Sequence, residues 1–151
     1  MDALTERRQL SAQRRKARHY AVQALYQWAI TGNDLADIEA HFVEDFDFRG
    51  TDAEYFRELL HGVPAELAGL EAAMDPYLDI ALEKLGPVER AVLRIAVWEL
   101  KNRPDVPCRV VLSEAIALAK KFGADQSHRF VNGVLDKVAR DLRGAEMARQ
   151  R

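Results

Sequence analysis

Cysteine is almost absent from this sequence, since Cys108 is the one example among 151 residues. A lone cysteine excludes an internal disulfide and a cysteine-rich zinc site. A chain without disulfides is typical of the cytosol. The sequence also has no run of about twenty apolar residues, so no segment is expected to cross a membrane as a helix. Together these absences favour a soluble, cytoplasmic protein that does not bind a membrane.

The common catalytic and metal-binding motifs are missing as well. No glycine-rich loop precedes a helix, and there is neither a His-Glu-x-x-His motif nor a nucleophile elbow. The four histidines have no metal-ligand spacing and are expected to be separate surface residues: His19, His41, His61 and His128. We therefore expect a protein that is not an enzyme and that holds neither a metal nor a cofactor.

Charge is distributed very unevenly along the chain. Residues 34–83 hold fourteen acidic and two basic side chains, whereas residues 1–20 hold six basic and two acidic ones. Residues 84–151 hold fourteen basic and eight acidic side chains. Basic ends around an acidic middle can present a surface for a polyanion although the net charge is only −2. The alternative is that these charge runs are solvated faces without a ligand.

Helical periodicity of apolar residues runs through nearly the whole chain, so the predicted fold is all-α with about seven helices. The segment after Pro87 is apolar on almost every face and is expected to be a central, buried helix. Thr51 and Glu54 have the spacing of a capping box, with Thr51 as the cap. The expected helices cover residues 14–31, 35–46, 52–63 with a separate or kinked helix at 64–75, 77–85, 87–102, 107–122 and 126–142.

The boundary between two packed helical subdomains is predicted at Asp75-Pro76, because the residue before a proline disfavours helix. The polar end of the chain is expected to fray. The expected parts are a flexible extension at 1–13, helical halves at about 14–75 and 77–143, and a frayed tail at 144–151.

The strongest binding signal is the basic run Arg14, Arg15, Lys16 and Arg18, placed by this prediction at a helix start. Arg14, Arg15 and Arg18 share one arc of the helix. Unpaired amides and arginine forks at a helix N-terminus can both reach a phosphate. The alternative is that these residues keep the helix soluble.

A second basic group combines Lys120, Lys121 and Arg129 with Phe130, which lies at the edge of an apolar stripe. Cations beside a partly exposed aromatic ring suit single-stranded nucleic acid. The alternative is a phenylalanine at the edge of the core. Gly133 in the same helix should cost about 1 kcal/mol relative to alanine, which predicts a close backbone approach by a packed helix or a ligand.

Several long motifs follow one another along the chain: RRKAR at 14–18, AVQALY at 21–26, YFRELLHGV at 55–63, VERAVLRIA at 88–96, VWEL at 97–100, EAIALAKKFG at 114–123 and FVNGVLDK at 130–137. In this order they resemble the motifs of the NusB family of bacterial transcription antitermination factors. The resemblance covers about residues 14–142 and implies an RNA-binding domain at 14–143.

The resemblance implies two packed helical subdomains that bind the boxA element of nascent ribosomal RNA. It also implies a complex with NusE, a small-subunit ribosomal protein, that keeps RNA polymerase elongating through terminators. RNA contacts would fall on the run from Arg14 to Arg18 and on the neighbourhood of Phe130, and NusE contacts on Tyr26 and Glu89.

Two positions depart from the family pattern. Gln126 stands where some relatives have an acidic residue, and Ser113 replaces a frequent asparagine. Two other functions remain open: a protein-interaction scaffold, and the helical RNA-binding domain of a ribosomal RNA methyltransferase. The second would need a catalytic domain, for which 151 residues are expected to be too few.

Overall fold

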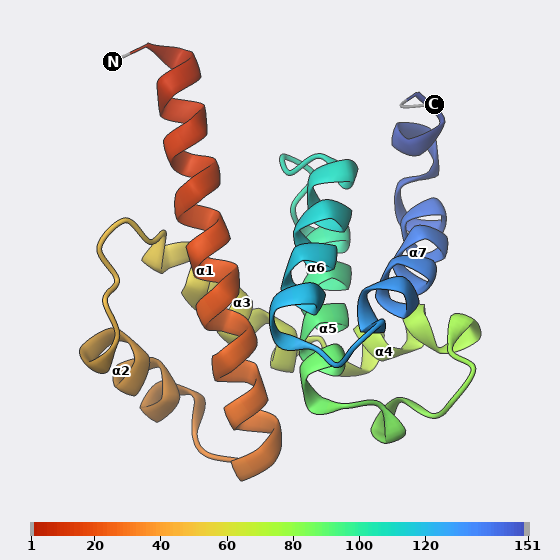
Figure 1. Ribbon diagram of the computed structural model, residues 1–151, viewed down its shortest axis with the longest axis horizontal. Coiled ribbons are helices and arrows are strands. Elements are labelled where there is room, and N and C mark those ends of the chain that lie inside the picture. Colours follow the sequence, from red (N-terminus) through yellow and green to blue (C-terminus); the bar gives the residue numbers. More distant parts are fainter. Residues whose placement is uncertain (1, 150–151) are drawn as a thin grey trace. The chain divides into compact units, whose positions relative to one another are not determined.

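The computed structural model describes residues 2–149, and over this range the chain forms seven α-helices, two short 3₁₀ helices and no strand (Figure 1). The all-α prediction is confirmed. None of the described helices is long and apolar enough to cross a membrane. The α-helices are α1 (Ala3–Thr31), α2 (Leu35–Asp45), α3 (Ala53–Ala65), α4 (Leu67–Met74), α5 (Pro87–Asn102), α6 (Cys108–Phe122) and α7 (Ser127–Arg149).

The chain divides into two compact units, Met1–Pro64 and Ala65–Arg151, so the predicted boundary at Asp75-Pro76 is too late. The reason is the packing of α4 against α5 and α7 of the second unit. Leu70 and Met74 of α4 are fully buried. The Arg94 guanidinium of α5 also contacts the Glu71 carboxylate of α4 at 2.8 Å. The boundary between the two units therefore lies at the end of α3.

In the first unit, α1 begins much earlier than predicted. Asp2 caps it by accepting a hydrogen bond of 2.8 Å from the Thr5 amide, so residues 3–13 are helical rather than a flexible extension. No glycine or proline occurs before Gly32, and alanine, leucine, glutamate, arginine and glutamine are strong helix formers. The helix ends as predicted at Gly32, which takes a left-handed φ of 68°.

The cap of α3 also differs from the prediction. The Asp52 carboxylate accepts a hydrogen bond of 3.0 Å from the Tyr55 amide, whereas the Thr51 hydroxyl is buried without a hydrogen-bond partner among the described residues. The helix consequently begins one residue later than a Thr51 cap would place it. Behind this cap, Phe56 contacts the rings of Phe42 and Phe48 in the aromatic core of the unit.

The second unit is built around α5, in which every residue from Ala91 to Leu100 is buried, as its apolar sequence predicts. α6 and α7 pack against α5 and against each other. The brief helix predicted at 77–85 is instead two 3₁₀ turns, Asp75–Tyr77 and Leu82–Lys84. Leu82 is the one buried residue of these turns, so the segment lacks the apolar face that would stabilise a longer helix.

Arg143 anchors the last helix to the end of α5. Its guanidinium donates hydrogen bonds to the carbonyl oxygens of Glu99 (3.0 Å), Leu100 (2.9 Å), Arg103 (2.6 Å) and Val106 (2.6 Å). The last carbonyls of a helix have no partner within the helix, and a cation there is also favoured by the helix dipole. The backbone of Arg143 is non-helical, with φ −138° and ψ 38°, so α7 is kinked at this residue.

The segment beyond the kink is not frayed, which corrects the prediction for residues 144–149; residues 150 and 151 lie outside the described range. The Glu146 carboxylate accepts a hydrogen bond of 2.7 Å from the Cys108 amide and contacts Arg143 at 3.1 Å. The Cys108 hydrogen bond is the main cause of a lowered pKa of Glu146, with a contribution from Arg143. Burial raises the pKa of the Cys108 thiol, which is buried as a free cysteine.

Candidate nucleic-acid interface

The basic run lies in the middle of α1 and not at its N-terminus. Because the helix begins at Ala3, the backbone amides from Arg14 to Arg18 are bonded within the helix and cannot bind a phosphate. The part of the prediction that relied on a helix end is therefore wrong. Any phosphate contact in this region has to come from side chains.

Two arginines of the run pack against Tyr55 of α3. The guanidinium carbons of Arg14 and Arg18 lie 4.8 Å and 5.5 Å from the centroid of the Tyr55 ring. Arg14 also contacts the Asp52 carboxylate at 3.8 Å, and Arg18 is only 3% exposed. Cation–π contacts of this kind contribute about 0.5–2 kcal/mol, so these two side chains help to hold α1 against α3.

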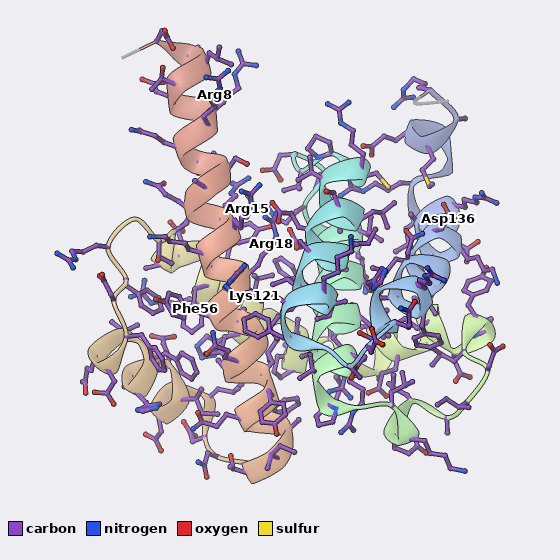
Figure 2. The ribbon with its side chains drawn as sticks, in the orientation of Figure 1. Arg8, Arg15, Arg18, Phe56, Lys121 and Asp136 are labelled. Carbon is purple, nitrogen blue, oxygen red and sulfur yellow. The ribbon has the colours of Figure 1, made fainter. Side chains whose placement is uncertain are left out.

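The other two cations of the run, Arg15 and Lys16, are exposed. The Lys16 ammonium lies 3.4 Å from the Arg49 carbonyl oxygen, a long hydrogen bond. Figure 2 shows Arg15 and Arg18 on the same side of α1, as the predicted arc requires. Of the four residues proposed from the sequence, Arg15 and Lys16 are the best placed to meet a ligand. An RNA contact by Arg14 or Arg18 stays a prediction.

The second basic group borders the loop between α6 and α7 in the other unit. Lys120 and Lys121 end α6, and Arg129 and Phe130 lie in the first turn of α7. The three cations are exposed and Phe130 is half-buried, so part of the Phe130 residue remains accessible. The structure thus brings these four predicted residues to one end of the second unit.

Glu89 of α5 anchors the α6–α7 loop, because its carboxylate accepts a hydrogen bond of 3.0 Å from the Ala124 amide. Gly123 has no room for a side chain, because a Cβ there would lie 2.4 Å from Ser127 Oγ and 2.7 Å from the Ala119 carbonyl oxygen. This anchoring was not predicted, since the two segments are far apart in the sequence. Glu89 therefore supports the neighbourhood of the predicted RNA residues.

The two departures from the family pattern differ in their surroundings. Gln126 takes a φ of 67°, a left-handed conformation that costs an ordinary residue roughly 1 kcal/mol. Its place in the α6–α7 loop puts this strained residue beside the second basic group. Ser113 is exposed on α6.

The predicted partner residues lie in different units. Tyr26 is 41% exposed on α1, whereas Glu89 is half-buried at the start of α5. A contact of NusE with either residue stays a prediction. Among residues 2–149, no three histidine, cysteine, aspartate or glutamate side chains are grouped so that they could hold a metal.

Gly133 does not meet a packed helix, contrary to the close approach considered for it. A Cβ at Gly133 would have no atom of the chain within 4 Å. Gly133→Ala should therefore raise the free energy of unfolding by about 0.5–1 kcal/mol, because glycine is costly inside a helix. Urea unfolding of the two proteins would measure this, and a destabilised variant would contradict it. A simultaneous loss of RNA affinity would show that a ligand makes the close approach instead.

Comparisons with known proteins agree with this arrangement. A model of the NusB family matches residues 15–140. The transcription antitermination protein NusB of Teredinibacter turnerae is 58% identical over 137 residues, which cover 90% of this chain and 93% of that protein. The protein of the same name from Proteus mirabilis is 57% identical over 132 residues, covering 87% and 96%.

Solved structures give the same result. The structure of T. maritima NusB matches with a TM-score of 0.76 at 31% identity, covering 89% of this chain and 96% of that chain. A complex of the antitermination factors NusB and NusE with double-stranded RNA matches with a TM-score of 0.70 at 28% identity, covering 84% and 96%.

Proposed function

Because the chain belongs to the NusB family, we propose that it is a transcription antitermination factor that binds boxA RNA together with NusE. The observation that carries this proposal is the family match over residues 15–140, which includes both basic groups except Arg14. The solved relative in complex with NusE and RNA supports the same partners. In this proposal the protein is not an enzyme, and it acts on the RNA polymerase elongation complex in the bacterial cytoplasm, where nascent ribosomal RNA is made.

In the proposed complex, exposed cations neutralise RNA phosphates and one aromatic ring stacks on a base. Arg15 and Lys16 are the exposed cations of the first basic group, and Lys120, Lys121 and Arg129 are those of the second group, which also contains Phe130. These groups can position a strand, but they include few side chains that read base edges. A partner that adds RNA contacts would supply the remaining affinity and sequence discrimination.

The first test is a titration of boxA RNA in the presence and absence of NusE. We expect modest RNA binding by the protein alone and tighter binding when NusE is added. Thermodynamic reciprocity requires RNA to tighten NusE binding by the same factor. A scrambled RNA is the control and should gain less from NusE. The proposal would be wrong if the protein bound neither RNA nor NusE.

The second test concerns Arg15 and Lys16. Replacing both by alanine should lower the magnitude of the log–log salt slope of RNA binding by about 1.4, since each single-strand phosphate contact contributes about 0.7. Lys84→Ala with Arg109→Ala removes two exposed cations outside both basic groups and should leave the slope unchanged. Equal slopes for the two double variants would reject Arg15 and Lys16 as phosphate ligands.

The third test separates two roles of Glu89. Glu89→Lys should weaken NusE binding and also RNA binding, because it removes the acceptor for the Ala124 amide and so releases the α6–α7 loop. Glu89→Gln keeps an acceptor oxygen but loses the charge, so NusE binding should fall while RNA binding is kept. Calorimetry with NusE and RNA separately measures both. If Glu89→Gln lost RNA affinity but bound NusE normally, the partner assignment would be wrong.

A further inference from the structure

The first turns of α1 are helical, but none of their residues is buried against the rest of the unit. Every residue from 2 to 12 is exposed, and burial begins only at Ala17. We call residues 3–12 the N-terminal arm. The arm precedes the segment that matches the NusB family, which starts at residue 15. Its function is therefore not implied by the family.

The arm continues the arginine arc of the basic run. At about 100° per residue, Arg7 and Arg8 fall within the same arc of about 120° as Arg14, Arg15 and Arg18. The two acidic residues of this part of the chain, Asp2 and Glu6, fall outside that arc. Figure 2 shows Arg8, Arg15 and Arg18 on one side of α1. The helix thus carries a basic stripe along one side. Arg14 and Arg18 of this stripe pack against Tyr55, whereas Arg7, Arg8 and Arg15 are exposed.

The outer end of this stripe has no anionic partner among residues 2–149. Arg7 makes a weak hydrogen bond of 3.4 Å to the Ala3 carbonyl oxygen within its own helix, and neither Arg7 nor Arg8 is paired with a carboxylate. Arginines that face the same way on a helix repel one another. A polyanion laid along the stripe would remove this repulsion, and phosphates match the planar guanidinium fork.

We propose that the N-terminal arm lengthens the RNA-binding surface, with Arg7 and Arg8 contacting phosphates that flank the RNA segment bound at Arg15 and Lys16. The inference rests on the RNA binding proposed above. At about 1.5 Å per residue, Arg8 lies about 10 Å along the helix axis from Arg15. The two sites therefore engage different phosphates of one strand. Because phosphates carry no base identity, the arm adds affinity for flanking RNA of any sequence.

The test compares two RNAs, the boxA element alone and the same element extended by a few nucleotides at both ends. For the extended RNA, Arg7→Gln with Arg8→Gln should reduce affinity and lower the magnitude of the salt slope by about 1.4. For the boxA element alone, the double variant should bind as the wild type does. Glutamine is a good helix former, so the arm stays helical, which circular dichroism checks.

A charge-matched control puts the same change on the opposite side of the arm. Thr5→Glu with Gln9→Glu also lowers the net charge by two, but both positions lie away from the stripe. Thr5 and Gln9 lie on the same face of α1 as Lys16, so this variant should lower the salt slope less than Arg7→Gln with Arg8→Gln does. Arg7→Lys with Arg8→Lys should keep the wild-type slope, because counterion release requires the positive charge and not the fork.

Four outcomes would overturn the inference. An unchanged slope for the glutamine variant would show that the arm does not touch RNA and would leave an acidic protein as its partner. If Thr5→Glu with Gln9→Glu lowered the salt slope as much as the glutamine variant, the effect would come from net charge and not from contacts of Arg7 and Arg8. An equal loss on the short RNA would show that the arm does not bind flanking nucleotides. A wild-type protein that binds neither RNA would overturn both this inference and the proposed function, whereas the first three outcomes leave the function intact.

Discussion

Replacing Arg143 by alanine should lower the free energy of unfolding by about 2–6 kcal/mol. The side chain is 9% exposed and donates to four carbonyl oxygens at the end of α5 and just beyond it. A buried acceptor left without its partner costs about 1–3 kcal/mol. The Leu100 and Val106 carbonyls face this loss, whereas the Glu99 and Arg103 carbonyls also accept from the Arg103 and Val106 amides. Urea unfolding followed by far-UV circular dichroism would measure the change.

Arg140 provides the matched control, because it is three residues away on the same helix and forms only a surface ion pair of 3.0 Å with Asp136. Arg140→Ala should cost less than about 1 kcal/mol. Arg143→Lys should be intermediate, since one ammonium cannot reach all four carbonyls. Equal stabilities for the two alanine variants would show that Arg143 does not anchor α7.

The stability that the Arg143 and Glu146 contacts provide also depends on pH, because Glu146 titrates. Its pKa is lowered from 4.5, chiefly by the Cys108 amide and secondarily by Arg143. A carboxylate with a lowered folded pKa contributes stability that is fully present above the unfolded value and is lost as the pH falls through the folded value. In the wild type this contribution is therefore complete above about pH 4.5, and Arg143→Ala removes part of it.

Phe130→Ala should weaken RNA binding by about 1–3 kcal/mol, which is roughly 5- to 150-fold, if one base stacks on the ring. The salt slope should change little, because stacking releases no counterions. Phe130 is half-buried, so the same variant also loses core contacts and melts at a lower temperature. RNA affinity at several salt concentrations and thermal melting would be measured together.

Phe130→Leu separates the two contributions. Leucine keeps most of the apolar contact with the core but presents no aromatic face to a base. The leucine variant should therefore be nearly as stable as the wild type and should bind RNA about as poorly as the alanine variant. Wild-type RNA affinity in Phe130→Leu would reject stacking and leave Phe130 as a core residue.

Helix positions were accessible from the sequence because burial of one helical face imposes a period on apolar residues. α5 is the clearest case, since its apolar residues predict burial on every side and the structure agrees. The predicted end of α6 at residue 122 is confirmed, and the start of α7 was predicted to within one residue, whereas α7 continues past its predicted end at residue 142. Local chemistry decides these features, so a single sequence contains enough information to predict them.

Features that depend on contacts between distant residues were not accessible. The hydrogen bond from Ala124 to Glu89 joins residues 35 positions apart, and that from Arg143 to Leu100 joins residues 43 apart. The burial of Arg18 against Tyr55 is of the same kind. The basic run could therefore be recognised, but the sequence could not divide it into arginines that pack within the protein and cations that face outward.

α1 is one continuous helix, but its first turns and its buried part should unfold locally at very different free energies. Its residues up to 12 are exposed, while Ala17, Ala21 and Leu25 are buried. Local opening requires little free energy where no apolar contact is lost and much more where the core is disrupted. Amide hydrogen exchange should thus be fast near Arg7 and slow near Ala21 within an unbroken helix. The outer turns are then a segment that a bound polyanion can order without disturbing the core.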